Sequence, residues 1–216
     1  MVSTKELLNN LRKEYASAEL LKSKMATDPI DQFGIWFEEA LKAEVSDINV
    51  MALATATKAG APSCRTVLIK DYSSRGITFY TNYESRKGRE LAENPLAALN
   101  FFWPELGRQI VIEGNIEKVD EDISTEYFDS RPEDSKIGAL ASNQSAFLEN
   151  RSILDNKAIE LANEYQDKKI EKPHYWGGYL VIPYRVEFWQ SRPNRLHDRL
   201  QYVLEDNGWG LSRLSP

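Results

Sequence analysis

Hydrophobic residues recur at helical spacing in several parts of the chain, and the clearest case follows residue 28. Asp28 and Pro29 are residue types that begin helices, the first as a capping side chain and the second at the first helical position. An apolar stripe follows, formed by Ile30, Phe33, Phe37, Ala40 and Leu41. The pattern therefore predicts an amphipathic helix that buries one face.

Other segments carry similar helical signals. Near the N-terminus the apolar positions at helical spacing are Leu7, Leu8, Leu11 and Tyr15. Helices are also expected over residues 85–93, over 120–142 with a break at Pro132, and over 153–167. The stripe of the last one is formed by Leu154, Ala158, Leu161 and Tyr165.

The remaining apolar segments are short, rich in β-branched and aromatic residues, and separated by turn signals. They predict strands over residues 50–57, 65–70, 77–81, 97–103, 109–119, 179–190, 200–205 and 209–214. Runs of hairpins interrupted by helices indicate an α+β fold whose core is a closed or partly closed antiparallel barrel. No linker divides the sequence, so we expect a single domain over residues 1–216.

The composition excludes several classes of protein. The chain has 216 residues, enough to bury a core, and its one cysteine, Cys64, leaves no disulfide framework within it. Cys64, His174 and His197 are too few for a zinc site of four Cys and His ligands, so we predict no metal. No apolar run approaches the roughly 18 residues that span a bilayer. The N-terminus lacks a signal-peptide core, so we expect a cytoplasmic protein without membrane contact.

The net charge of −6 argues against a nucleic-acid binder, but the charge is unevenly distributed. Residues 64–89 carry six basic side chains against two acidic ones, and residues 190–199 carry three against one. Two compact basic segments in an acidic protein suit small anionic ligands. The alternative is that these cations decorate strand edges and solvated turns.

The first basic segment contains a possible phosphate site. Ser85 can cap a helix whose first turn holds Arg86 and Lys87, and cations are unfavourable at that end unless an anion binds there. The alternative is an exposed, slightly mismatched helix start. Arg65 and Lys70 lie five residues apart on one predicted strand, so they should point to opposite faces and could meet different anions.

A second possible anion site surrounds Pro132. If this proline begins a new helix, Arg131 and Ser135 flank its N-terminus, and Tyr127 reaches in from the preceding turn. The alternative is that Tyr127 is a half-buried helix residue and Arg131 a surface cation.

The third constellation lies near the C-terminus. Arg195, His197 and Arg199 should share one face of an extended strand, with Trp189 nearby, and arginine can both grip an anion and stack on a planar ring. The alternative for His197 is a structural role. The amides of Gln109 and Gln144, with Ser145, suit the edge of a heteroaromatic ring, although each on its own is typical of a surface residue.

Familiar catalytic motifs are absent: the sequence has no Rossmann or P-loop glycine pattern and no serine-hydrolase elbow. An enzyme with this sequence would therefore take its chemistry from a bound cofactor. Six short motifs do occur in one order: Arg65-Thr66-Val67-Leu68-Ile69-Lys70, Phe79-Tyr80-Thr81-Asn82, Ser85-Arg86-Lys87, Ser130-Arg131-Pro132, Trp176-Gly177-Gly178 and Arg195-Leu196-His197-Asp198-Arg199. With them the sequence, from about residue 11 to its end, resembles the pyridoxamine/pyridoxine 5′-phosphate oxidase family.

The resemblance implies an α+β fold, an FMN-binding split β-barrel, antiparallel with flanking helices. It also implies a homodimer with FMN at the subunit interface and a helical, partly mobile segment over residues 1–27. The implied FMN contacts are Arg65, Thr66, Val67, Leu68, Lys70, Tyr80, Thr81, Arg86, Lys87, Gln109, Gln144, Ser145, Trp189 and Arg199. The implied contacts to the substrate phosphate are Lys70, Tyr127, Arg131 and Ser135.

Two further sets complete the implied site. Arg195 and His197, the catalytic candidates, would lie over the substrate ring together with Leu196. The segment that would close over the substrate comprises Arg12, Lys13, Glu14 and Tyr15. Arg192 receives no role.

The implied activity is the final step of vitamin B6 cofactor synthesis and salvage. Pyridoxamine 5′-phosphate and pyridoxine 5′-phosphate are oxidised to pyridoxal 5′-phosphate by hydride transfer from C4′ to FMN, and O₂ reoxidises the flavin to give H₂O₂. One alternative is a non-catalytic carrier or sensor on the same barrel, holding flavin or a tetrapyrrole-like ring. Another, a barrel that binds single-stranded nucleic acid by aromatic stacking, fits poorly with the negative charge.

Overall fold

The computed structural model describes residues 19–216, which fall into two compact units. Unit 1 comprises residues 19–48, 101–111 and 185–216, and unit 2 comprises residues 49–100 and 112–184. The single domain expected over residues 1–216 stays a prediction. So does the N-terminal helical segment, because residues 1–18 lie outside the described residues; residues 19–27 contain one 3-10 turn, η1 (Lys22–Lys24).

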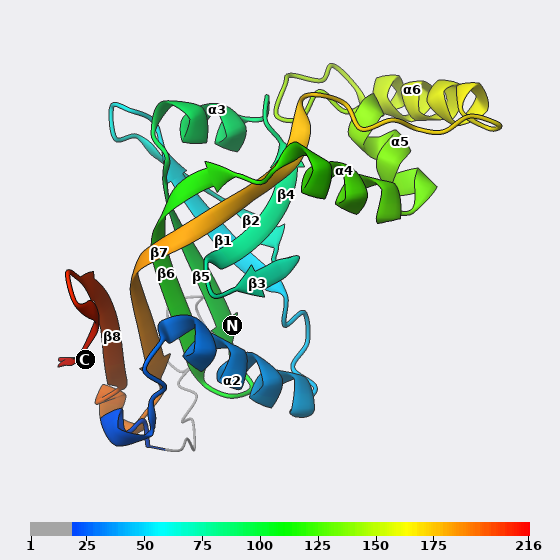
Figure 1. The fold of residues 1–216 in the computed structure, drawn as a ribbon. Coiled ribbons are helices and arrows are strands. Elements are labelled where there is room, and N and C mark those ends of the chain that lie inside the picture. The colour runs from blue at the N-terminus through cyan, green and yellow to red at the C-terminus, as the bar shows by residue number, and fades with distance from the viewer. Residues whose placement is uncertain (1–18) are drawn as a thin grey trace, which may run out of the picture. The chain divides into compact units, whose positions relative to one another are not determined.

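Unit 2 holds most of an antiparallel sheet. Its strands are β1 (Val50–Ala56), β2 (Pro62–Leu68), β3 (Asp71–Ser73), β4 (Gly76–Asn82), and parts of β5 (Leu96–Trp103), β6 (Arg108–Lys118) and β7 (Trp176–Gln190). Their order in the sheet is β2-β1-β5-β6-β7-β4-β3. Residues that alternate between buried and half-buried along β1 explain why Val50–Ala56 forms a strand with one face in the core. All eight predicted strands are found, some with ends shifted by a few residues (Figure 1).

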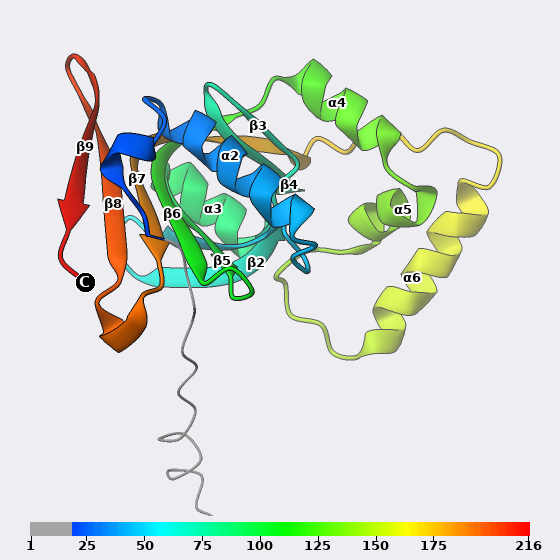
Figure 2. The same ribbon diagram turned by 90° about the horizontal axis from the view of Figure 1, so that it is seen from below.

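The helices of unit 2 begin within two residues of where the sequence predicts. They are α3 (Arg86–Glu93), α4 (Glu121–Ser130), α5 (Glu133–Ala141) and α6 (Arg151–Glu164), and Pro132 separates α4 from α5 as expected. Helices α4, α5 and α6 lie together in both views (Figures 1 and 2). Leu161 and Tyr165 pack against a small buried cluster that contains Phe128, Ile137 and Trp176. This cluster fixes α4 and α5 beside the start of β7.

Unit 1 contains α2 (Pro29–Lys42), which the Asp28 carboxylate caps by accepting a hydrogen bond from the Ile30 amide at 2.7 Å. The helix buries Phe33 against Phe101, with ring centroids 5.1 Å apart. The predicted stripe is wrong at Leu41, which is 62% exposed at the end of the helix. Strands β8 (Asp198–Glu205) and β9 (Gly208–Leu214) form a hairpin that pairs with the second half of β7 (Figure 2).

The strand expected over residues 65–70 ends earlier, at Leu68. The backbone leaves β1 here and turns to β4, because the Lys70 amide donates to the Thr78 carbonyl at 2.9 Å. The prediction that Arg65 and Lys70 share one strand is therefore wrong. Within residues 19–216, no helix is both long and apolar enough to cross a membrane.

Candidate functional site

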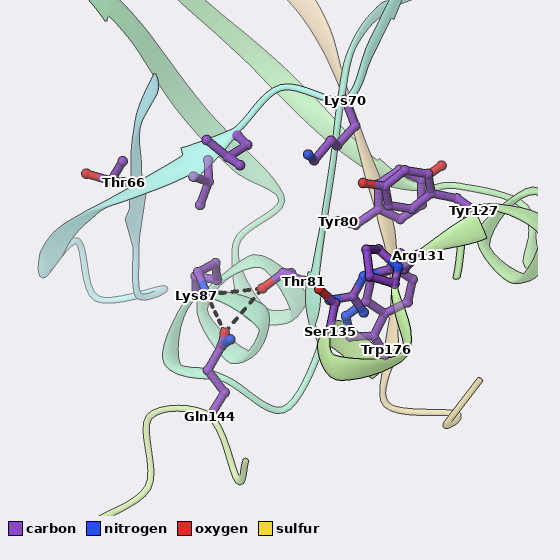
Figure 3. A pocket seen from close by; sticks show the side chains of 13 residues that line it. Thr66, Lys70, Tyr80, Thr81, Lys87, Tyr127, Arg131, Ser135, Gln144 and Trp176 are labelled. Carbon is purple, nitrogen blue, oxygen red and sulfur yellow. Dashed lines mark hydrogen bonds between the residues drawn. The ribbon is translucent and has the colours of Figure 1, made fainter. Parts of the chain in front are cut away.

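A cavity of about 470 Å³ lies in unit 2 (Figure 3). Its lining residues are Thr66, Val67, Leu68, Lys70, Tyr80, Thr81, Lys87, Tyr127, Arg131, Pro132, Ser135, Gln144 and Trp176. Three of these described residues are cations and none is an acid. A cavity with uncompensated positive charge beside aromatic rings suits a planar, anionic ligand.

One side of the cavity is built around Lys87. The Ser85 hydroxyl caps α3 by accepting from the Gly88 amide at 3.3 Å, which places Lys87 in the first turn. The ammonium of Lys87, a residue only 8% exposed, donates to Gln144 Oε1 at 2.6 Å and to Thr81 Oγ1 at 3.1 Å (Figure 3). Both acceptors are neutral. Burial, followed by the nearby charge of Arg65, lowers the pKa of Lys87 to about 8, so a phosphate here would supply the missing countercharge.

The other side is built around Arg131. This residue ends α4, and Ser135 lies in the first turn of α5 just beyond Pro132. The guanidinium carbon of Arg131 is 4.8 Å from the ring centroid of Trp176, and its Nη1 is buried with no hydrogen-bond partner among the described residues. Burial lowers the pKa of Arg131. A buried nitrogen of a cation that has no acceptor is costly, and an anionic ligand would satisfy it.

Three aromatic rings stack beside Arg131. The centroids of Tyr80 and Tyr127 are 3.9 Å apart, and that of Trp176 lies 5.4 Å from Tyr80, with all three rings nearly parallel (Figure 3). Gly178 pairs with Tyr80 across β4 and β7, and a Cβ at Gly178 would come within 2.9 Å of the Tyr80 ring. The glycine therefore leaves the space that lets Tyr80 join the stack.

Two predicted FMN contacts, Arg65 and Arg86, do not line this cavity. Both bind the buried carboxylate of Glu90: Arg86 Nε lies 2.8 Å from Oε1, and Arg65 Nη2 lies 3.4 Å from Oε2. Cations at the N-terminus of α3 are unfavourable, and the carboxylate of Glu90 compensates part of that positive charge. A further predicted contact, Ser145, lies in a neighbouring groove with a left-handed backbone, φ 71°.

The other predicted contacts belong to unit 1. His197 lies against Trp189, with ring centroids 4.5 Å apart, and its Nδ1 accepts from the Arg192 amide at 3.1 Å. The guanidinium of Arg199 donates to both oxygens of Glu187, at 2.7 and 2.8 Å. These contacts hold His197 and Arg199 in place without a ligand.

The prediction that Arg195, His197 and Arg199 share a strand face is wrong. Asn194 and Arg195 have left-handed backbones, with φ of 57° and 61°, and β8 begins only at Asp198. The chain therefore turns at Arg195 instead of continuing as a strand.

The structure thus brings eleven of the predicted residues to one cavity: Thr66, Val67, Leu68, Lys70, Tyr80, Thr81, Lys87, Tyr127, Arg131, Ser135 and Gln144. Gln109 is half-buried on β6 and Leu196 is 68% exposed, both in unit 1. Residues 12–15 lie outside the described residues, so Arg12, Lys13, Glu14 and Tyr15 stay predictions. The sequence indicates no role for Trp176, although Trp176-Gly177-Gly178 is one of the six motifs. Its contact with Arg131 joins residues that are 45 positions apart, so no local pattern shows it.

Comparison with protein families gives two matches. Residues 37–164 match the family described as pyridoxamine 5′-phosphate oxidase. Residues 176–216 match the pyridoxine 5′-phosphate oxidase C-terminal dimerisation region.

Curated relatives are similar over nearly the whole chain. The pyridoxine/pyridoxamine 5′-phosphate oxidase of Trichormus variabilis is 50% identical over 208 residues, 96% of this chain and 97% of that protein. That of Salinibacter ruber is 50% identical over 212 residues, covering 97% and 99%.

Solved structures show the same fold. PhzG from Burkholderia lata, in complex with tetrahydrophenazine-1-carboxylic acid, is 32% identical with a TM-score of 0.88, covering 94% of this chain and 100% of that one. A pyridoxamine 5′-phosphate oxidase-related, FMN-binding protein from Nostoc punctiforme has a TM-score of 0.68 at 16% identity, covering 89% and 99%. The predicted α+β split-barrel fold class is confirmed. The chain belongs to the pyridoxine/pyridoxamine 5′-phosphate oxidase family.

Proposed function

We propose that this protein is an FMN-dependent oxidase that converts pyridoxamine 5′-phosphate and pyridoxine 5′-phosphate to pyridoxal 5′-phosphate. One observation carries the proposal: three cations, Lys70, Lys87 and Arg131, line a single cavity, with Lys87 on one side and Arg131 on the other, and no acid is among its described lining residues. A carrier of flavin alone needs one phosphate site. Two sites suit two phosphorylated planar molecules held together.

The residues present fit FMN at the Lys87 side. The buried ammonium, with its pKa lowered to about 8, has only neutral partners within residues 19–216. The lining residues Thr66, Val67 and Leu68 offer a strand edge nearby. Bound FMN would supply the two-electron oxidation and the reaction with O₂ that yields H₂O₂. The wider FMN contact set, Arg65, Lys70, Tyr80, Thr81, Arg86, Gln109, Gln144, Ser145, Trp189 and Arg199, is part of this proposal.

At the Arg131 side, the chain's own residues hold the substrate phosphate. Arg131 offers an unsatisfied Nη1, Ser135 adds a hydroxyl at the start of a helix, and Tyr127 and Lys70 complete the set. Fixing the phosphate fixes the far end of a small rigid molecule. Positioning of this kind orients C4′ for oxidation and lowers the entropic cost of reaction.

Arg195 and His197 are proposed to bind the substrate ring, with His197 accepting or tuning a proton at the amine or hydroxyl. Family membership supports these roles. Replacement of Arg195 by Leu tests the first of them: turnover should fall while FMN stays bound. Unchanged turnover and unchanged substrate affinity would remove Arg195 from the site.

The protein works as a homodimer in this proposal, with FMN at the subunit interface. The match of residues 176–216 to a dimerisation region supports the oligomeric state. We also propose a cytoplasmic location, on the sequence pattern alone.

The colour of the purified protein tests the activity. We expect a yellow protein whose flavin absorbance near the blue end of the spectrum disappears anaerobically when pyridoxamine 5′-phosphate is added, and returns with H₂O₂ when air is admitted. A yellow protein that keeps its colour with both phosphorylated vitamers would be a flavin carrier. A colourless protein that takes up no FMN would refute the proposal.

A further inference from the structure

A buried carboxylate lies behind the cations of the cofactor side. Glu90 is one turn after Arg86 on α3, and it is only 4% exposed. Its Oε2 accepts hydrogen bonds from the hydroxyls of Thr55 and Ser63, both at 2.5 Å. Burying an ionised carboxylate is costly unless it is fully hydrogen-bonded, so this arrangement needs a reason beyond filling space.

The same carboxylate joins two arginines from different elements. Arg86 on α3 donates from Nε to Oε1 at 2.8 Å, and Arg65 on β2 lies with Nη2 3.4 Å from Oε2. Arg65 is held further by Thr55 Oγ1 at 2.6 Å and by the Leu53 carbonyl at 3.2 Å. Glu90 therefore fixes the helix that begins at Arg86 against the strand that carries Arg65.

This cluster is linked to the cavity through Lys87. Arg86 directly precedes Lys87 on α3, and Arg65 directly precedes Thr66 on β2; both Lys87 and Thr66 line the cavity. The charge of Arg65 also contributes to the lowered pKa of Lys87. Glu90 itself is ionised: burial raises its pKa, but hydrogen bonds from Ser63, Thr55 and Arg86 outweigh burial and lower it to about 2. Its negative charge thus persists at neutral pH beside the guanidinium groups of Arg65 and Arg86.

We propose that Glu90 is a positioning residue that holds Arg65 and Arg86 in the places from which they bind the phosphate of FMN. The proposal rests on the proposed function, since it needs the phosphate at this side of the cavity. No contact between Glu90 and the cofactor is required. The carboxylate acts through the two guanidinium groups, which would otherwise repel each other and Lys87.

Glu90 could act through its negative charge or by positioning the arginines. The two roles predict opposite changes in FMN affinity when the carboxylate is removed, which makes the proposal testable. If the carboxylate acted only as a charge, its loss would make the site more positive and FMN would bind more tightly. If it positions the arginines, its loss releases them and FMN binds more weakly. The sign of the change in affinity therefore separates the two.

The experiment is a titration of FMN into apoprotein, followed by the quenching of flavin fluorescence. We expect Glu90→Gln to raise the Kd for FMN about tenfold, while Glu93→Gln, an exposed position on the same helix, leaves it unchanged. An unchanged or lower Kd in Glu90→Gln overturns the proposal. A role confined to folding would lower the melting temperature and leave the Kd of the folded apoprotein unchanged.

A double-mutant cycle identifies the path. If Glu90 acts through Arg86, the effect of Glu90→Gln should shrink at least threefold in an Arg86→Met background, and fully additive effects overturn the proposal. If Glu90→Gln does not fold, Ser63→Ala removes a hydroxyl that donates to the carboxylate and accepts from Arg65, and we expect its Kd to rise about threefold; an unchanged Kd overturns the proposal. Wild-type apoprotein that fails to bind FMN would instead refute the proposed function.

Discussion

Several arginines near the C-terminus, in unit 1, have acidic partners, whereas the cations of the cavity in unit 2 have none among the described residues. In unit 1, Arg199 binds both oxygens of Glu187. Arg213 and Arg192 both pair with Asp198, the second at 3.6 Å. Each of these arginines has an acidic partner in its own chain.

Among the described residues that line the cavity, none is an acid. Within the part of the chain that the structure describes, Lys87 donates only to neutral oxygens, and Arg131 lies on aromatic rings with a buried nitrogen that has no partner. A buried cation without an acidic partner lowers the stability of the fold, and binding of an anionic ligand offsets that cost. The comparison teaches that Arg192 and Arg213, which pair with Asp198, should matter for folding, and that the cations of the cavity should matter for binding.

The largest effect is expected at Arg131. Arg131→Ala removes the cation proposed to pair with the substrate phosphate. Loss of one partner of such a pair costs about 2–5 kcal/mol, so KM for pyridoxine 5′-phosphate should rise about 100-fold. Flavin content should stay unchanged. Steady-state kinetics and the absorbance of bound flavin measure both quantities.

The matched control is Arg151→Ala on α6, an exposed arginine paired with Asp155, which should leave KM unchanged. Loss of flavin from Arg131→Ala would show that Arg131 binds FMN, and it would contradict the proposal that the two sides of the cavity bind different molecules.

The next effect concerns Lys87 and pH. A charge-assisted hydrogen bond contributes about 1.5–3 kcal/mol, so Lys87→Met should weaken FMN binding about 30-fold. The free-protein pKa of Lys87 is about 8, and bound phosphate raises it, so binding takes up a proton above pH 8. The Kd for FMN in the wild type should therefore increase as pH rises from 8 to 10.

Fluorescence titrations of apoprotein between pH 7 and 10 check this prediction. In Lys87→Met the same curve should be flatter, because the titrating group is gone. A wild-type Kd that is constant over this range would show that Lys87 does not bind the phosphate.

A smaller effect is expected at Trp176, which acts through Arg131. Loss of a desolvated cation–π contact costs about 1–2 kcal/mol, so Trp176→Leu should raise KM about tenfold and change FMN affinity little. Trp176→Phe keeps an aromatic face and should recover most of the loss. Equal KM values in the Leu and Phe variants would mean that the ring does not orient Arg131.

The smallest effect tests the other half of the comparison. Arg213 is half-exposed and paired with Asp198, so Arg213→Ala should lower stability by about 1 kcal/mol, roughly 2–4 °C in melting temperature. Arg131→Ala apoprotein should melt no lower than the wild type. Differential scanning calorimetry measures the melting temperatures of both variants. If Arg131→Ala melted at a lower temperature than Arg213→Ala, Arg131 would contribute more to folding than Arg213, against this prediction.

Local signals predicted much of this fold. Asp28 and Ser85 cap their helices because capping depends on neighbours two or three residues away. Pro132 separates α4 from α5 for the same reason, and that turn brings Arg131 and Ser135 to one cavity. Patterns of this range are visible in a sequence.

The errors arose where distant segments decide the conformation. Lys70 leaves its predicted strand because the backbone turns to pair with Thr78. The error at Arg195 is local instead: this residue ends the turn Pro193–Arg195 with a left-handed backbone, so the strand begins only at Asp198. Glu90 gave no signal, since Thr55 and Ser63 reach it from other strands.

The aromatic stack of Tyr80, Tyr127 and Trp176 also gives the cavity an optical reporter. The chain has five tryptophans, and Trp176 is the one that lines the cavity among the described residues. Its emission depends on the guanidinium above it and on any absorbing molecule beside it. The difference between the emission spectra of wild type and Trp176→Phe should therefore follow the arrival of cofactor and substrate in real time, without a label.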